Sequence, residues 1–175
     1  STSLSRGTRL KTALRALFIC LLAATLAACG FKLRGPQTLP FDTIAVPGVT
    51  TLRTEIKRAI QTQSNAKVVE NVNDADAVLD ISREASEKVI LSLTTRGRVR
   101  EYQLRYLVSY RVTRKQGGVY VPPTTVLLTR DITFNDEILA KETEEQQLYA
   151  EMRADFVQQL MRRLAAAKPL LPDEY

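Results

Sequence analysis

Few side chains in this sequence can carry out chemistry at neutral pH. The chain has no histidine, which excludes imidazole bases, Ser-His triads and histidine metal ligands. Its seven glycines are scattered and form no Gly-rich phosphate loop. The composition does not exclude catalysis by a pair of carboxylates. However, Asp74/Asp76 and Glu142/Glu144/Glu145 are more typical of solvated charges in a loop and at the start of a helix. We therefore expect no enzyme activity, no cofactor and no metal site.

Cys29 lies where the chain changes character. The 28 residues before it carry four basic side chains and no acid, and Ala16 to Ala28 is mostly apolar. A membrane-spanning helix needs about 20 apolar residues. A shorter apolar run that follows a basic segment and ends in small residues is typical of a secretory signal peptide. A buried N-terminal helix is the alternative.

The residues around the cysteine are more specific. Leu26-Ala27-Ala28-Cys29 resembles the lipobox of bacterial lipoproteins. The resemblance implies cleavage before Cys29, diacylglycerol on its sulfur and fatty acylation, such as palmitate, of the new amino terminus. Each buried CH₂ contributes about 0.8 kcal/mol, so stable anchoring takes two lipid signals. Gly30 in place of aspartate implies, by analogy with lipoprotein sorting, delivery to the outer membrane.

Four segments are expected along the chain. A signal peptide over 1–28 is removed, a lipidated tether covers 29–40, one α/β domain covers 41–168, and a short tail covers 169–175. Cys20 leaves with the signal and Cys29 is alkylated, so no thiol is left for a disulfide or a nucleophile. The formal net charge of +6 includes the basic residues of the signal, so it does not argue for nucleic acid binding.

Hydrophobic periodicity predicts the elements of the domain. Strands are expected over 41–46 and 67–69 with a helix over 51–63 between them, followed by strands over 77–94, 102–113 and 126–134 and a long helix over 141–167. This order predicts an α/β (α+β) fold, a two-layer sandwich with two helices on one face of a mainly antiparallel four-stranded sheet. The other face, with Arg105, Arg111 and Thr113, must meet water or a polar partner.

Two details of the strands follow from side-chain parity. Apolar residues alternate with polar ones over 102–113, and only Leu107 interrupts the polar side. In the preceding strand, for which a bend near Arg83–Ser86 is an alternative to a straight course, the parity predicts one shared apolar face for Ala77, Leu79, Ile81, Val89, Leu91 and Leu93. Thr95-Arg96-Gly97 predicts a turn. Pro122-Pro123 is expected to interrupt the last strand, which indicates an edge strand or a bulge there.

Three stretches together resemble the LptE family of lipopolysaccharide-assembly lipoproteins. These are the start of the mature chain, Cys-Gly-Phe-Lys-Leu-Arg-Gly, the stretch Arg96–Gln103, which resembles the family's central hairpin, and the stretch Leu139–Leu164, which resembles its last helix. The likeness covers essentially the whole mature chain.

The resemblance implies a role in a Gram-negative outer membrane. It implies a lipid-anchored protein on the periplasmic side that forms a heterodimer with the β-barrel protein LptD. It would sit inside the barrel lumen as a plug, help the barrel assemble, and bind lipopolysaccharide in transport to the cell surface. No bond is made or broken in this role, and nucleic acid is not a partner.

Basic side chains are the candidates for lipopolysaccharide contact, because arginine and lysine suit phosphate groups. The candidates are Arg96, Arg98, Arg100 and Lys141, and in the resembling family a basic hairpin residue and the lysine of Leu-Ala-Lys are linked to this contact. Contact with the barrel wall, or simple solvation of an exposed hairpin, are the alternatives.

Two other classes of protein compete with this interpretation. The first is another outer-membrane lipoprotein scaffold, accessory to β-barrel folding or to lipid transport. The second is a small tethered hydrolase, which the missing histidine and the lack of a nucleophile elbow disfavour.

Overall fold

The computed structural model describes residues 35–133 and 138–171, with side chains of the second range described from residue 142. The chain divides into two compact units, Ser1–Gly35 and Pro36–Tyr175, and the fold below is that of the second. The predicted signal peptide and Cys29 lie outside the described residues. Within the described ranges, no helix is long and apolar enough to cross a membrane. The predicted division into signal, tether, domain and tail stays a prediction.

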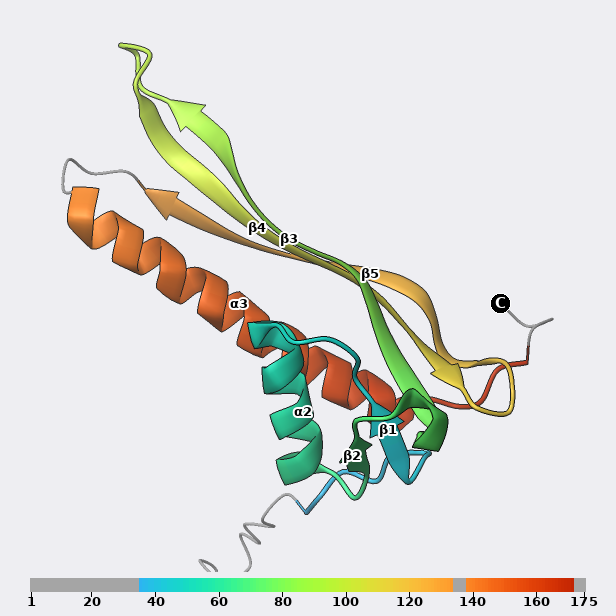
Figure 1. Ribbon diagram of the computed structural model, residues 1–175. Helices are drawn as coiled ribbons and strands as arrows, with labels where there is room; N and C mark the ends of the chain where they lie inside the picture. Colours follow the sequence, from blue (N-terminus) through green and yellow to red (C-terminus); the bar gives the residue numbers. More distant parts are fainter. Residues whose placement is uncertain (1–34, 134–137, 172–175) are drawn as a thin grey trace, which may run out of the picture. The chain divides into compact units, whose positions relative to one another are not determined.

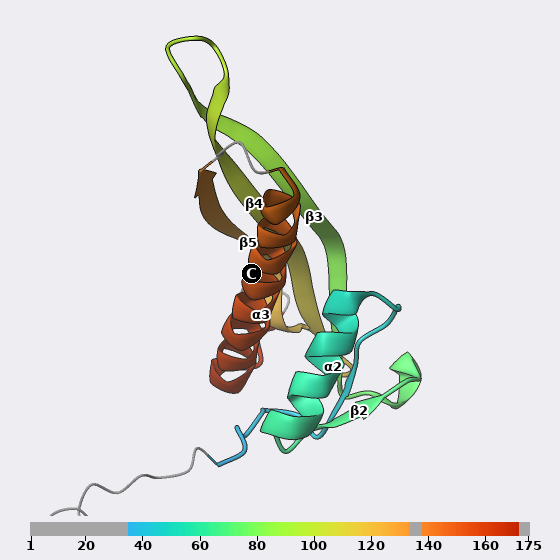
Figure 2. The same ribbon diagram turned by 90° about the vertical axis from the view of Figure 1, so that its left-hand side faces the viewer.

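The domain is built from two helices and one mixed sheet (Figures 1 and 2). The sheet order is β2-β1-β3-β4-β5, with β1 parallel to both β2 and β3 and the last three strands antiparallel. In chain order the described elements are β1 (Thr43–Ala45), α2 (Thr51–Gln63), β2 (Lys67–Val69), the short 3-10 helix η1 (Val72–Asp74), β3 (Ala77–Leu93), β4 (Val99–Arg114), β5 (Val119–Thr133) and α3 (Ile138–Ala166).

The predicted α+β class is confirmed, with one correction to the sheet. It has five strands, not four, because both short strands join it and β1 pairs with β2 on one side and β3 on the other. A three-residue strand adds little stability alone, but β1 carries the buried residues Ile44 and Ala45 into the core. The burial of these side chains therefore stabilises β1, which is too short to be stable through its backbone pairing alone.

The two helices form where the apolar stripes predict them. Thr50 caps α2 by accepting a hydrogen bond from the Arg53 backbone N–H, at 3.3 Å. The core side of each helix is fully covered, and its buried residues are Leu52, Ile56, Ala59 and Ile60 in α2 and Met152, Phe156, Val157, Leu160, Met161 and Leu164 in α3. The same core takes the alternate residues of β4, Leu104 to Val112.

A β-bulge divides β3 into two parts. Ile81 pairs with Tyr110 and Arg83 pairs with Ser109, so Ser82 is an extra residue on β3. The Ser82 hydroxyl donates a hydrogen bond of 3.2 Å to the Ser109 carbonyl oxygen. Side chains alternate with a period of two, so one extra residue exchanges the two faces of the residues that follow, up to the next register shift past Ile90.

The predicted shared face for the whole of this strand is therefore wrong. Ala77, Leu79 and Ile81 are buried, as expected. Past the bulge, Glu84 pairs with the buried Val108 on the helix face, and Val89 pairs with Gln103 on the uncovered face. The later apolar residues of β3 consequently do not reach the core.

The two prolines lie in an edge strand, as predicted, but they do not interrupt it. β5 runs through them from Val119 to Thr133. Tyr110 pairs with Thr124, whereas Val112 pairs with Val121, so the register shifts at Pro122-Pro123. An edge strand tolerates the missing N–H groups, because one side of it pairs with no other strand.

Candidate functional site

The end of the β3–β4 hairpin, residues 89–101, is called here the hairpin tip. The last residues of β5 pair with Glu101 and Tyr102. The hairpin continues past them as two strands, and Figures 1 and 2 both show it extending beyond the end of β5. The tip therefore lacks the third strand that flanks the rest of the hairpin.

A tight turn closes the tip. The Gly97 N–H donates to the Thr94 carbonyl oxygen at 2.9 Å, and the Thr94 N–H donates to the Arg98 carbonyl oxygen at 2.7 Å. Gly97 has a φ of +74°, a conformation that glycine adopts without strain. The predicted turn at this point is confirmed, and it fixes where the arginines lie.

The three candidate arginines come together at this turn. Arg96 and Arg98 lie in the connection and Arg100 is the second residue of β4, and all three are exposed. Glu101 accepts a hydrogen bond from the Ser92 hydroxyl. Within the described part of the chain, none of the three guanidinium groups forms an ion pair. The turn thus presents a concentrated positive charge to its surroundings.

The fourth candidate, Lys141, belongs to the first turns of α3, and its side chain lies outside the described part. Lys88 forms an ion pair with Glu145, one turn further along the helix. The Lys88 ammonium also lies 4.5 Å from the centroid of the Tyr102 ring. These contacts bring the start of α3 to the base of the hairpin tip.

A second bond reinforces this joint. The Tyr149 hydroxyl donates a hydrogen bond of 2.7 Å to the Glu87 carbonyl oxygen. Burial raises the pKa of Tyr149, and the nearby carboxylates of Glu145 and Glu87 add to the effect. The tyrosine therefore stays a neutral donor at neutral pH.

Apolar side chains accompany the arginines, and parity predicted the core face for Val89, Leu91 and Leu93 among them. Val89, Ile90, Leu91 and Leu93 are 36%, 54%, 48% and 56% exposed. The missed features are the bulge at Ser82 and the two register shifts past Ile90, which the spacing of apolar residues does not reveal. The hairpin tip is therefore both basic and apolar.

The uncovered sheet face, called here the outer face, is mostly polar. Arg111 forms an ion pair with Asp80 at 3.2 Å, and the hydroxyls of Ser109 and Thr125 are hydrogen-bonded at 2.8 Å. Gln103 donates to Asp131 at 3.2 Å. The predicted polar character of this face is confirmed.

One apolar row crosses the outer face. Leu107 pairs with Ala85 on β3 and with Leu127 on β5, so the three side chains lie in register across three strands. Leu127 is 52% exposed. The sequence singled out Leu107 as the exception, but only the pairing shows that it has neighbours.

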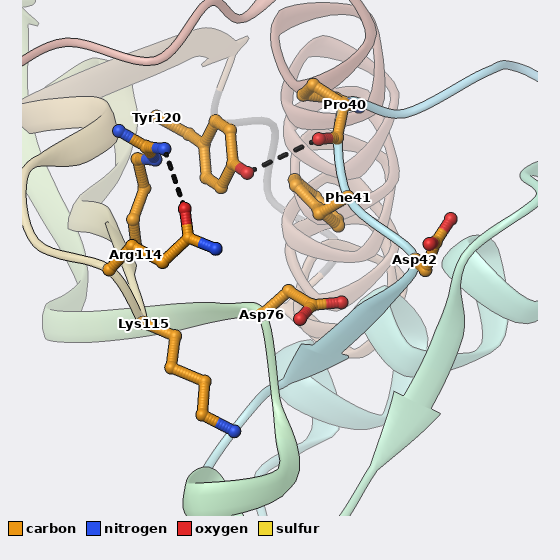
Figure 3. A pocket seen from close by; sticks show the side chains of 8 residues that line it. Pro40, Phe41, Asp42, Asp76, Arg114, Lys115 and Tyr120 are labelled. Atoms are coloured by element: carbon orange, nitrogen blue, oxygen red, sulfur yellow. Dashed lines mark hydrogen bonds between the residues drawn. The ribbon is translucent and has the colours of Figure 1, made fainter.

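A small cavity of about 200 Å³ lies where the chain enters the domain (Figure 3). The Tyr120 hydroxyl donates to the Pro40 carbonyl oxygen at 3.3 Å. Arg114 lies 5.5 Å from the Tyr120 ring centroid and donates to Gln116 at 3.4 Å. Phe41 packs on the same ring, with centroids 5.1 Å apart.

The acid beside this cavity has a structural role. Asp76 accepts hydrogen bonds from the Thr43 hydroxyl at 2.8 Å and the Thr43 N–H at 3.1 Å. The side-chain bond from Thr43 is the main reason that the pKa of Asp76 lies below its usual value. The carboxylate thus joins the residue just before β3 to β1. Within the described residues, no cluster of acids, cysteines or histidines could hold a metal ion.

Comparison with known proteins decides the family. A family model described as "LptE: Lipopolysaccharide-assembly" matches residues 41–164. The chain belongs to the LptE family. This confirms the resemblance to the family, with Arg96–Gln103 and Leu139–Leu164 inside the match, and LptE proteins are non-enzymatic lipopolysaccharide-assembly lipoproteins. The comparison with curated proteins gave no match.

Solved structures of bacterial lipoproteins share the LptE fold. Uncharacterized lipoprotein B from Nitrosomonas europaea is 38% identical with a TM-score of 0.68, and the match covers 78% of this chain and 91% of that one. Rare lipoprotein B from Shewanella oneidensis is 26% identical with a TM-score of 0.63, covering 71% and 95%. A minor lipoprotein from Acinetobacter baumannii, 22% identical with a TM-score of 0.61 over 77% and 99%, shows the fold alone.

The family and the lipoprotein neighbours indicate a lipopolysaccharide-assembly role in the cell envelope. In this LptE chain, the hairpin tip and the outer face are surfaces that do not contribute to the core. That Arg96, Arg98, Arg100 and Lys141 bind lipopolysaccharide stays a prediction, and so does lipidation at Cys29.

Proposed function

We propose that this LptE protein is an outer-membrane lipoprotein that plugs an LptD-type β-barrel, helps it assemble, and binds lipopolysaccharide for delivery to the cell surface. The observation that carries the proposal is the family match over residues 41–164. Cys29 would hold the protein to the membrane on its periplasmic side, and the domain would occupy the barrel lumen as one half of a heterodimer.

The outer face supports the barrel contact. The lumen of a large β-barrel is polar, so a domain that fills it needs a surface that can exchange hydrogen bonds with the wall. The Ser109–Thr125 hydroxyl pair and the Gln103–Asp131 bond provide such groups on an open sheet. The row of Ala85, Leu107 and Leu127 adds a narrow apolar strip at its centre.

The arginines of the hairpin tip support lipopolysaccharide binding. Lipopolysaccharide carries phosphate groups, and arginine binds phosphate through two parallel hydrogen bonds. Arg96, Arg98 and Arg100 form no ion pair with the described residues, so binding would not first require an internal contact to break.

Isolation of the native complex tests the barrel partner. The wild-type protein is purified from membranes, and we expect a large β-barrel protein to co-purify in equal amount. Replacement Cys29→Ala should abolish membrane attachment of the mature protein. Recovery of a barrel-folding machine or a lipid transporter in place of LptD would favour the scaffold alternative.

Binding of lipopolysaccharide to the purified protein tests the second part. The variant carrying Arg96→Glu, Arg98→Glu and Arg100→Glu should bind at least about tenfold more weakly. Arg58→Glu on the exposed side of α2 is the matched control and should bind as the wild type does. Equal binding by all three proteins would remove the arginines from the site.

A further inference from the structure

We infer that the hairpin tip contacts fatty acyl chains as well as phosphates, with Ile90, Leu91 and Leu93 receiving the chains of the amphiphile whose phosphates lie at the arginines. This inference rests on the proposed lipopolysaccharide binding and adds a second, apolar contact to it. The tip would then recognise the junction between the charged and the apolar parts of the ligand.

The fold itself does not need these apolar side chains. Ile90 pairs with Tyr102 on the helix face, while Val89 pairs with Gln103 on the outer face. No single layer of the domain could cover both faces of the same ribbon. Soluble monomeric domains rarely keep contiguous large apolar residues in water unless something binds to them. The exposure of the tip therefore points to an occupant from outside the domain.

The position of Leu93 places the apolar surface next to the charge. Leu93 pairs with Val99, which stands between Arg98 and Arg100 on the opposite strand. Neighbouring strands lie about 4.8 Å apart, so Leu93 lies directly across from the short backbone segment that carries both arginines. The apolar residues continue back along β3 from this point to Ile90, away from the turn.

The charge of the tip selects among apolar occupants. Apart from Glu101, which the Ser92 hydroxyl contacts, every charged side chain between residues 89 and 101 is an arginine. A positive end with an adjoining apolar surface complements an amphiphile whose anionic groups sit directly above its acyl chains. A neutral apolar peptide would provide no anionic group to pair with the arginines.

The test compares two ligands on the same full-length protein, held in nanodiscs of phosphatidylcholine. One ligand is intact lipopolysaccharide and the other is the same molecule after complete chemical removal of its acyl chains. The variant is Ile90→Thr with Leu93→Thr, because threonine keeps the strand propensity while removing apolar surface. Leu127→Thr, at an equally exposed leucine on the outer face, is the matched control.

We expect the wild type to bind the intact ligand more tightly than the deacylated one. The double variant should lose roughly tenfold or more in affinity for intact lipopolysaccharide, down to the level of the deacylated ligand. Its affinity for the deacylated ligand should equal that of the wild type, and the control should bind both as the wild type does.

Three results would overturn the inference. If the double variant binds intact lipopolysaccharide as tightly as the wild type, the apolar residues do not contact it, and the proposed function still stands. If that variant instead loses its barrel partner on purification while its ligand affinity is unchanged, the tip is a protein contact. If the wild type binds neither ligand, lipopolysaccharide binding itself fails, and the acyl contact fails with it.

Discussion

The Arg53 guanidinium donates a hydrogen bond of 3.0 Å to the carbonyl oxygen of Ile81. Ile81 is the last residue of β3 before the bulge at Ser82. Through its Nε, the same guanidinium also donates 2.8 Å to the Pro47 carbonyl oxygen. Arg53 therefore connects the first turn of α2 to the point where β3 exchanges its faces, and the bulge is supported by a helix distant in sequence.

Removal of this guanidinium should destabilise the domain. Arg53→Met keeps much of the aliphatic stem but leaves the two carbonyl oxygens without their donor. Hydrogen bonds from charged groups contribute about 1.5–3 kcal/mol each, and partial exposure of this site reduces that value, so we expect a loss of about 1–2 kcal/mol. Urea denaturation measures the free energy of unfolding. Arg58→Met, at an exposed position of the same helix, should change it by less than about 0.5 kcal/mol, and equal losses in both variants would contradict the role of Arg53.

Gly118 should tolerate no side chain, because the C-terminal segment lies against it. A Cβ at this residue would come within 2.2 Å of the Leu170 carbonyl oxygen. Leu170 and Val119 exchange two backbone hydrogen bonds, of 2.8 and 3.0 Å. Gly118→Ala should therefore free the segment or shift the β4–β5 turn.

The neighbouring glycine separates this clash from backbone strain. Gly117 has a φ of +87°, but a Cβ added there would meet no atom within 4 Å, whereas Gly118 has a φ of +79°. Gly117→Ala should cost about 1–2 kcal/mol from the left-handed conformation alone. We expect Gly118→Ala to cost roughly 1–3 kcal/mol more in thermal or urea unfolding. Equal losses of stability in the two variants would show that Leu170 can move away from the added Cβ at no energetic cost.

The stability of the domain should fall in alkaline solution because of Tyr106. This residue is 2% exposed, and its hydroxyl donates 2.8 Å to Glu84. Burial, together with the Glu84 carboxylate, raises the pKa of Tyr106 far above its usual value of 10.0. The unfolded chain therefore releases this proton at a lower pH than the folded chain, so the contribution of Tyr106 is complete below the unfolded pKa and is lost as the pH rises above it.

Tyr106→Phe isolates that effect. Near pH 8 the variant should be less stable than the wild type by about 1 kcal/mol, because one hydrogen bond is lost. Above the unfolded pKa, each pH unit removes up to about 1.4 kcal/mol from the wild type and nothing from the variant at this site. Urea denaturation at about pH 8 and about pH 11 should show the difference shrinking or reversing. A difference that stays constant would mean that Tyr106 ionises normally.

The row on the outer face should matter for the partner and not for the fold. Leu127→Glu places a charge in the proposed barrel contact, and we expect recovery of the barrel on purification to fall several-fold. The free energy of unfolding should change by less than about 0.5 kcal/mol, since the side chain is exposed. Val49→Glu, at a position 93% exposed just before α2, is the control and should keep the partner. Undiminished recovery with Leu127→Glu would take this row out of the interface.

Much of the fold follows from local patterns. The stripe of α2, the alternation over Tyr102–Val112 and the long apolar stripe of α3 each report burial on one side of one element, and each was predicted correctly. Pro122-Pro123 likewise indicated an edge strand, because proline has no N–H to donate to a second neighbour. The arginines were placed at a turn because Thr95-Arg96-Gly97 has turn chemistry.

Other features depend on contacts between distant parts of the chain. β1 and β2 are too short for the sequence to show that they belong to the sheet. Their place follows from parallel pairing of β1 with β2 on one side and with β3 on the other. The bulge at Ser82 leaves no mark in the spacing of apolar residues, since Val89, Leu91 and Leu93 keep the parity of Ile81. Only the register against β4 shows that the faces have exchanged.

The sequence by itself therefore determined the elements, the family and the concentration of arginines at one hairpin. Tertiary structure alone decided that Ile90, Leu91 and Leu93 lie in solvent beside those arginines, and that Leu107 has apolar neighbours across the sheet. The physical reason is that parity along one strand specifies a face only until a bulge occurs. Where a bulge falls depends on a distant helix and on the partner strand, through Arg53 and Ser109.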